Sequence, residues 1–208
     1  MRQSGIMLLS LCLSFAAGAE SEWLVPRPEA LQTPASVNTP QQECNFPTQI
    51  KLARKGNAEN QYQVALCYYY GLGVDADADK ALYWLKQATA QQHTKAMFQL
   101  AEFYNHHDKY YDPALAMEWY KKAAEKGHVK AQLRLAEMYV KGEGVPQDYV
   151  EAYKWFYLAG MFGANGEPQL RGNVRRQRQM LTQKMNPQQL TQAREVISNL
   201  LKQSSSLR

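Results

Sequence analysis

The chain has 208 residues, a mass of 23.8 kDa and a formal net charge of +5, with 45% hydrophobic residues and 9 prolines. This composition excludes an intrinsically disordered chain, and the length leaves room for one domain with a substantial core. The positive charge is mild, so the composition does not indicate a nucleic-acid partner.

The first 19 residues have the pattern of a secretory signal peptide. Arg2 supplies the positive start, residues 6–15 are apolar, and Ala17-Gly18-Ala19 is a small-residue cleavage site. The apolar run is shorter than the roughly 20 residues of a membrane-spanning helix, which disfavours an anchor. Lipid attachment through Cys12 is disfavoured because Leu11 stands where a small residue is needed. We expect cleavage after Ala19, no stable membrane insertion afterwards, and a periplasmic location, with secretion as the second choice.

Residues 20–43 contain prolines among polar side chains and few large apolar residues. Such a segment buries too little apolar surface to offset its ordering entropy, so we expect a flexible tether or simply an N-terminal tail. Phe46, Ile50 and Ala53 then follow a helical spacing, which predicts a short helix that ends at Gly56-Asn57.

The central part of the chain repeats itself. One tyrosine and one tryptophan recur three times at intervals of 35 or 36 residues. They are Tyr68, Tyr104, Tyr139, Trp84, Trp119 and Trp155. Self-similarity at this period is typical of a solenoid of helical hairpins. In the first repeat the apolar spacing predicts helices at about 58–70 and 77–91, with alanines that let the two helices approach closely.

The predicted turns between the paired helices are of two kinds. Gly71 and Gly73 mark the first turn, and Gly142 and Gly144 mark the third. These glycine pairs imitate a phosphate-binding loop, but they lack the preceding strand and the third glycine or Lys-Ser/Thr that such a loop needs. The second turn, residues 105–111, has neither glycine and is one residue shorter, so its geometry is left open.

After the third repeat the sequence predicts two more helices. Residues 167–184 form a basic helix, and Asn186-Pro187 with Gln189 begins a last amphipathic helix. The apolar positions of this last helix are Leu190, Ala193, Ile197, Leu200 and Leu201. We expect residues 204–208 to be a disordered tail.

Two stretches carry a family resemblance. Residues 71–84, with the pattern Gly-x-Gly-Val-x-x-Asp-x-x-Lys-Ala-x-x-Trp, and residues 119–132 resemble the Sel-one-like repeat, a relative of the tetratricopeptide repeat. Residues 185–193 resemble the helix that closes many such arrays. The resemblance implies an all-α, right-handed α-solenoid at 44–203. It consists of an N-terminal capping helix, hairpins at about 57–93, 94–128 and 129–163, and a C-terminal cap at 164–203.

Cys44 and Cys67 are the two cysteines that remain after signal cleavage. An even number in an exported protein favours a disulfide, and both cysteines lie at a similar distance from the turn at Gly56-Asn57. In the chain-entropy model such a bond is worth about 3 kcal/mol. The alternative is two unpaired, buried thiols.

No motif in the sequence indicates catalysis or a cofactor. His106-His107-Asp108 is the one tempting metal cluster, but it offers three adjacent ligands without the partner pair that a closed zinc site needs, so a polar loop is favoured. Because no nucleophile–base pattern stands out either, we expect no enzyme activity, no metal, no cofactor and no small-molecule substrate.

The best binding candidate is the outer side of the first helix of each pair. By resemblance, this is the concave face on which such repeats hold peptides or partner helices. Its members are Tyr62, Leu66, Tyr69, Tyr70, Phe98, Glu102, Asn105, His106, Leu133, Glu137 and Val140. A helix that is apolar on both faces is either sandwiched or exposes a docking surface, so packing of Tyr62, Leu66 and Tyr69 under the N-terminal helix is the alternative.

The basic helix is a second candidate. It carries Arg171, Arg175, Arg176 and Arg178, which could contact an acidic partner or simply form a solvated face. Export and the lack of interleaved aromatic residues argue against nucleic acid.

We therefore expect an exported, non-catalytic scaffold or adaptor that binds another protein of the bacterial cell envelope. A narrower resemblance, carried by the length, the signal, the three repeats, Glu43-Cys44 and the Arg-rich helix, is to the MotX family of the sodium-driven flagellar motor. That resemblance implies a periplasmic ring component that helps to hold the stator. The other alternative is a cell-wall or β-lactam-acting hydrolase, but its cysteine-rich examples have a cysteine pair in each repeat.

Overall fold

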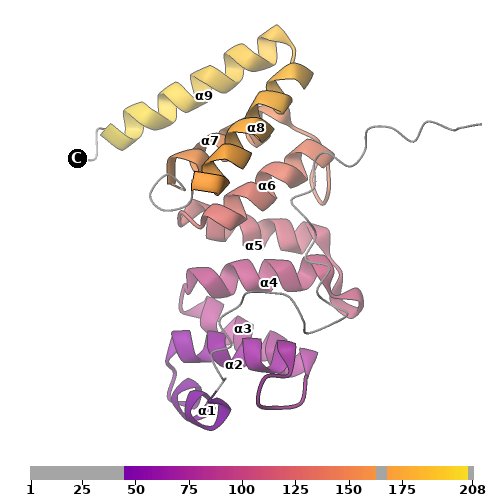
Figure 1. The fold of residues 1–208 in the computed structure, drawn as a ribbon, viewed down its shortest axis with the longest axis vertical. Coiled ribbons are helices and arrows are strands. Elements are labelled where there is room, and N and C mark those ends of the chain that lie inside the picture. Colours follow the sequence, from indigo (N-terminus) through magenta and orange to yellow (C-terminus); the bar gives the residue numbers. More distant parts are fainter. Residues whose placement is uncertain (1–44, 163–167, 206–208) are drawn as a thin grey trace, which may run out of the picture. The chain divides into compact units, whose positions relative to one another are not determined.

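The computed structural model describes residues 45–162 and 168–205, and this part of the chain consists of helices and connecting turns without a strand (Figure 1). The helices are α1 (Phe46–Arg54), α2 (Ala58–Tyr70), α3 (Ala78–Ala90), α4 (Thr94–His106), α5 (Pro113–Glu125), α6 (Val129–Lys141), α7 (Tyr149–Phe162), α8 (Pro168–Lys184) and α9 (Pro187–Ser205), with a short 3-10 helix η1 (Asp108–Tyr110). Within the described residues, no helix is both long and apolar enough to cross a membrane.

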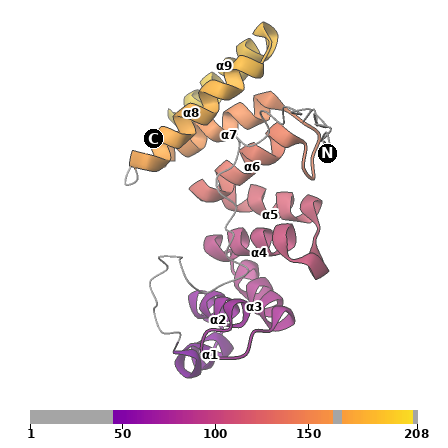
Figure 2. The same ribbon diagram turned by 45° about the vertical axis from the view of Figure 1, so that its right-hand side comes forward.

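From α1 to α8, each helix packs mainly on its neighbours in the sequence, which is the arrangement of an α-solenoid (Figures 1 and 2). The hairpins α2–α3, α4–α5 and α6–α7 are the three repeats, so the all-α solenoid expected from the periodicity is confirmed. α1 packs on α2 at one end, and both α8 and α9 contact α7 at the other. We call α2, α4 and α6 the A helices and α3, α5 and α7 the B helices.

Side-chain caps fix where the helices begin. In front of the A helices, the side chains of Asn57, His93 and His128 accept hydrogen bonds from backbone N–H groups in the first turn. Asp77 and Asp112 do the same for α3 and α5. These caps satisfy donors that a helix leaves unpaired at its N-terminus.

Alanines at equivalent positions form the contacts between helices. Their side chains are at most 1% exposed, and they are Ala65, Ala101 and Ala136 on the A helices and Ala81, Ala116, Ala152, Ala88, Ala123 and Ala159 on the B helices. Such small residues let the backbones approach, and the large side chains of Leu85, Tyr120 and Phe156 at another equivalent position are fully buried.

The second turn differs from the first and third as its sequence suggested. α2 and α6 end at Gly71 and Gly142 in left-handed conformations, whereas α4 is followed by the 3-10 helix η1. An equivalent backbone hydrogen bond nevertheless closes each of the three turns. The carbonyls of the repeated tyrosines accept from the N–H of the capping aspartates in the pairs Tyr68–Asp77, Tyr104–Asp112 and Tyr139–Asp148, at 2.8–3.0 Å.

The second and third turns are also anchored differently on the preceding repeat. In η1, Lys109 Nζ lies 3.1 Å from a carboxylate oxygen of Asp79, and the Tyr110 hydroxyl donates to the same carboxylate. The third turn instead brings Gly144, at φ +69°, against the backbone of Pro113 at the start of α5.

The N-terminal capping helix contacts α2 through aromatic and polar groups. The rings of Phe46 and Tyr68 meet edge to face with centroids 5.2 Å apart, and Gln61 Nε2 donates to the Ala53 carbonyl at 3.2 Å. Cys67 is buried next to this contact surface, but Cys44 lies outside the described residues, so their pairing stays a prediction. The expected signal peptide and tether lie outside these residues too.

At the other end, α9 is longer than expected. It reaches Ser205, two residues into the segment for which we expected disorder, because no proline or glycine interrupts the helical sequence there. Ala193 and Ile197 are the buried positions of α9, whereas Leu201 is 39% exposed.

Candidate functional site

The surface predicted to bind a partner lies on the A helices, and we call it the A-helix surface. In α2 it contains Tyr62, Leu66, Tyr69 and Tyr70, in α4 Phe98, Glu102, Asn105 and His106, and in α6 Leu133, Glu137 and Val140. These residues occupy four equivalent positions of the repeat, yet their chemistry changes from aromatic in α2 to charged in α4 and α6.

The aromatic end is built by four side chains of α2. Tyr69 and Tyr70 meet edge to face with ring centroids 4.8 Å apart, and Tyr69 also lies 5.8 Å from the Phe103 ring of α4. The Tyr62 ring lies 5.2 Å from that of His93, before α4. Tyr62 and Tyr69 thus contact the next repeat, whereas Asn60, Gln61 and Tyr68 make the polar and aromatic contacts with α1.

The tyrosines of this end remain protonated at any physiological pH. Burial, with the nearby Glu59 carboxylate and Tyr70 adding to it, raises the pKa of Tyr62 to about 12. Burial also raises the pKa of Tyr69 and of Tyr70. Tyr70 is nevertheless 55% exposed, so its ring offers both an apolar face and a hydroxyl donor to a partner.

The charged end is an ionic network between α4, α5 and α6. Glu102 Oε1 accepts a hydrogen bond from the Tyr120 hydroxyl at 2.5 Å and lies 3.3 Å from Arg134 Nε. Arg134 Nη1 donates to Glu137 Oε2 at 3.2 Å, and His106 Nε2 lies 3.7 Å from Glu102 Oε2. Two carboxylates thus share one guanidinium, and one of the two also accepts from a phenol.

Burial sets the electrostatics of this network. It would lower the pKa of Arg134, but the two carboxylates outweigh it and raise that pKa, so the guanidinium stays charged. Burial raises the pKa of Glu137, although Arg134 partly opposes this effect. Burial and the Glu102 carboxylate raise the pKa of Tyr120 well above its usual value. Glu137 is only 8% exposed, and its Oε1 has no hydrogen-bond partner among the described residues.

Three predicted members serve the packing as much as the surface. The Phe98 ring stacks on that of His128 with centroids 4.6 Å apart and also contacts the Tyr120 ring. Val140 is only 7% exposed, and Leu133 is half-buried.

Arg134 and Tyr120 belong to the network but were not predicted. Arg134 is three residues before Glu137 on α6, and a test for i, i+3 ion pairs could have found it. Tyr120 belongs to a B helix and occupies the core position of Leu85 and Phe156, so only the folded structure places its hydroxyl next to Glu102.

Three of the four predicted arginines of α8 line one hollow, and the fourth lies outside it. Arg178 lies over the rings of Tyr153 and Tyr157 of α7, at 5.9 and 5.6 Å from the ring centroids. Arg171 and Arg175 line a small hollow between α7 and α8 together with Arg178, whereas Arg176 is exposed and is not part of that lining.

The structure separates the adjacent His106 and His107. His106 turns toward Glu102 and Asn105, whereas the His107 ring stacks on Phe103 with centroids 4.9 Å apart. In the part of the chain that the structure describes, no group of three or more His, Cys, Asp or Glu side chains could hold a metal ion.

Comparison with known proteins agrees with this architecture. The model of the Sel1 repeat family matches residues 58–93, 94–128 and 129–161, which are the three helical hairpins. A component of the ERAD-associated E3 ubiquitin-protein ligase, HRD3A of Arabidopsis thaliana, is 42% identical over 53 residues. This match covers 25% of the chain but only 8% of that relative.

The solved structures that are similar to this chain include two short repeat proteins. The Sel1 repeat protein from Oxalobacter formigenes is 27% identical, with a TM-score of 0.54, over 62% of this chain and 96% of that one. Cysteine rich protein B of Helicobacter pylori is 20% identical, with a TM-score of 0.50, over 61% and 92% of the two chains, which supports the fold alone. None of these three proteins is named as a flagellar component, so the narrower MotX resemblance stays a hypothesis. The matched repeats make up half of the chain, and the protein therefore belongs to the Sel1 repeat family.

Proposed function

We propose that this protein is a non-catalytic scaffold of the bacterial cell envelope that holds a segment of another protein on its A-helix surface. Sel1 repeat proteins act as scaffolds for protein–protein interaction and are generally non-catalytic. The relative from Arabidopsis thaliana is itself named as a component of a larger ligase assembly, which supports an assembly role for repeats of this kind. The signal-like N-terminus supports export.

The observation that carries the proposal is that equivalent positions on the A helices hold different types of residue. The core alanines are the same in all three repeats, whereas the positions of Leu66, Glu102 and Glu137, and those of Tyr70 and His106, differ. The shared alanine contacts of the hairpins do not require this change from aromatic to charged side chains. These side chains give the surface an apolar, aromatic end and a polar end, which suits an extended or helical segment with apolar and charged residues at its two ends.

Tyr70 is the side chain best placed for contact, because it is 55% exposed and supported edge to face by Tyr69. Large aromatic side chains that are held rigidly are the usual energetic anchors of protein interfaces. Tyr83 offers a matched control, since it is also 55% exposed and meets the Trp84 ring edge to face, but lies on B helix α3.

The experiment is site-specific photocrosslinking in the native cells. A photoreactive phenylalanine analogue replaces Tyr70 in one strain, Tyr83 in a second and Arg176 in a third, and mass spectrometry identifies the crosslinked proteins. We expect one defined partner at position 70 and not at position 83. A partner captured only at position 176 would contradict the A-helix surface and assign the contact to α8. Absence of a partner at all three positions would contradict the scaffold role.

The proposed location has a separate test. Spheroplast preparation should release the protein with the periplasmic fraction, and mass spectrometry of the purified protein should find Glu20 as its first residue. The same sample should contain a peptide that links Cys44 to Cys67. A protein that stays in the cytosol and retains residues 1–19 would contradict export without affecting the test of the A-helix surface.

A further inference from the structure

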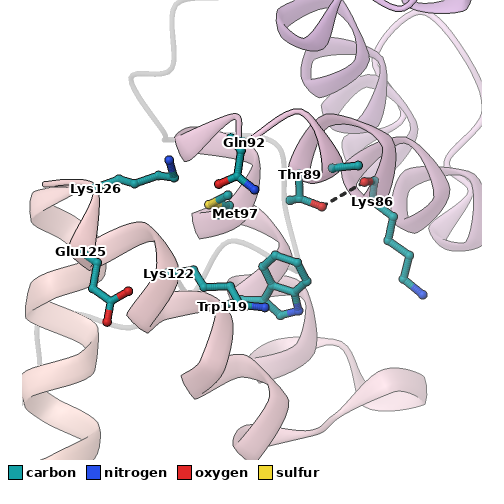
Figure 3. Close-up of a pocket in the computed structure, with 9 residues that line it drawn as sticks. Lys86, Thr89, Gln92, Met97, Trp119, Lys122, Glu125 and Lys126 are labelled. Carbon is teal, nitrogen blue, oxygen red and sulfur yellow. Dashed lines mark hydrogen bonds between the residues drawn. The ribbon is translucent and has the colours of Figure 1, made fainter.

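A second hollow of the molecule lies away from the A-helix surface, between the B helices of the first two repeats. It is an open groove with a volume of about 730 Å3, formed by the end of α3, the following turn, the start of α4, and α5 (Figure 3). Met97, which is 2% exposed, forms its floor, and the half-buried Trp119 ring forms one wall.

The turn that borders this groove has an unusual backbone. Gln92 has φ +62°, and it is the one non-glycine residue with positive φ in the ranges that the structure describes. The equivalent residues of the neighbouring turns are Gly56 and Gly127, with φ of +91° and +82°. A residue with a side chain is strained in this conformation, and such strain tends to occur where the side chain has a function. Here the Gln92 side chain lines the groove (Figure 3).

The equivalent junction between the second and third repeats differs in its side chains. Trp155, the counterpart of Trp119, is only 5% exposed, whereas Trp119 remains half-buried. The counterparts of Lys122 and Glu125 are the apolar Leu158 and Met161. The third repeat also places a lysine over its tryptophan, with Lys154 Nζ 4.8 Å from the centroid of the Trp155 ring. The first junction therefore differs in the greater exposure of its tryptophan and in the charged residues Lys122 and Glu125.

Basic side chains dominate the rim. Lys86, Lys122 and Lys126 line the groove with a single acidic residue, Glu125. Lys122 Nζ lies 4.0 Å from the centroid of the Trp119 ring, so a positive charge stands directly over the apolar wall. The chemistry that complements this arrangement is an apolar side chain flanked by carboxylates.

We propose that this groove is a second docking surface, which binds an acidic peptide segment of a partner protein through an apolar residue on Trp119 and carboxylates on the lysines. The inference goes beyond the A-helix surface, because it places a second partner segment on the B helices. Gln92 supplies an amide that can pair with the backbone of the peptide, which explains why the turn keeps a side chain where its neighbours have glycine.

The test uses the mature protein and a short synthetic peptide with a central Leu-Phe pair flanked by Asp and Glu. A matched peptide has Lys in place of every acidic residue. Isothermal titration calorimetry measures the affinity, and 19F NMR of protein that contains 5-fluorotryptophan reports which ring is contacted. We expect binding of the acidic peptide alone, with a shift of the Trp119 signal, which Trp119→Phe identifies.

Two variants test the groove without disturbing the core. Lys122→Glu/Lys126→Glu should weaken binding roughly tenfold, because two attractions become repulsions. Lys51→Glu/Lys55→Glu is the matched control at exposed positions of α1 and its C-cap, with the same change in net charge and the same spacing, and should bind as the wild type. Equal weakening by both double variants would show a non-specific effect of net charge and would overturn the proposal.

Gln92→Gly gives an effect that a merely structural role cannot imitate. It should raise the midpoint of thermal unfolding, since glycine adopts positive φ without strain, and at the same time weaken peptide binding roughly threefold. A variant that is more stable and binds as the wild type would remove Gln92 from the docking surface.

Other outcomes also decide the matter. The proposal would be overturned if the acidic peptide failed to bind. It would also be overturned if the 19F signal of Trp155 shifted instead of that of Trp119. An oligothymidylate of equal charge provides the comparison with a nucleic acid. If it binds more tightly than the peptide and depends on the same lysines, the groove is a general anion surface and the peptide proposal fails.

Discussion

The second and third repeats place the same alanines at the same helix contacts but finish their hairpins in different ways. The second repeat closes its turn with a 3-10 helix, which Lys109 and Tyr110 tie to Asp79 through side chains. The third repeat closes it with glycines, one of which touches the backbone of Pro113. Its tryptophan is buried, whereas that of the second repeat borders a groove. The alanine contacts thus set the hairpin geometry, and the turns and tryptophans are free to vary.

Truncation of the two tryptophans should give the largest difference in stability between changes in the second repeat and changes in the third. Trp155→Ala removes a ring that is 5% exposed and should lower the free energy of unfolding by about 3–5 kcal/mol. Trp119→Ala should cost roughly half as much, because part of its ring already faces solvent. Urea unfolding monitored by circular dichroism measures both. Equal losses would show that the groove closes around Trp119 in solution.

The glycine turn should be the next most sensitive element. In Gly144→Ala the new Cβ would lie 2.4 Å from the Pro113 carbonyl oxygen, in a backbone conformation that alanine resists. We expect a loss of about 2–4 kcal/mol in unfolding free energy. Gly172→Ala is the control, since its Cβ meets nothing within 4 Å on α8 and should stabilise the protein by about 0.5–1 kcal/mol. A tolerated Gly144→Ala would mean that the third turn can move away from α5.

The smallest expected effect concerns the histidine that caps α6. His128 Nδ1 accepts from the Ala131 N–H at 3.2 Å, which requires this nitrogen to be unprotonated. Burial, with Lys130 and Lys95 adding to it, lowers the pKa of His128, whereas Glu102 acts in the opposite direction. The unfolded chain therefore takes up the proton more readily, and stability should fall as the pH drops below the ordinary histidine pKa of about 6.5.

His128→Asn tests this assignment, because asparagine caps helices well and Asn57 already occupies the equivalent position before α2. The variant should lose less stability than the wild type between about pH 7.5 and about pH 5.5 in urea unfolding. An unchanged pH dependence would show that His128 is not responsible for it.

Much of the fold could be predicted because the residues that define the repeat act within one helix or one hairpin. Tyr68, Trp84 and their counterparts reveal the period, and the helical spacing of the alanines gives the paired helices. The missing glycines at 105–111 indicated a different second turn, but not that it would be a 3-10 helix. The length of α9 was underestimated, since a serine-rich end does not by itself stop a helix.

The functional surfaces could be predicted only in part. The outer positions of the A helices follow from periodicity. The network of Glu102, Tyr120 and Arg134, however, joins three helices and two repeats, and no local sequence pattern predicts contacts between residues so far apart in the chain. The role of Gln92 could not be predicted from the sequence either. Its left-handed backbone becomes meaningful only when its turn is compared with those of Gly56 and Gly127.

From α1 to α8, each helix packs on its sequence neighbours, and this has a consequence for how the chain folds and how it can be lengthened. No early helix waits for a distant one, so hairpins can form in turn as the chain emerges, and folding should be fast for a protein of this length. For the same reason, a copy of the unit from Thr94 to His128 could be inserted after His128 without new kinds of contact. Array length is therefore a quantity that evolution or an engineer can adjust one hairpin at a time.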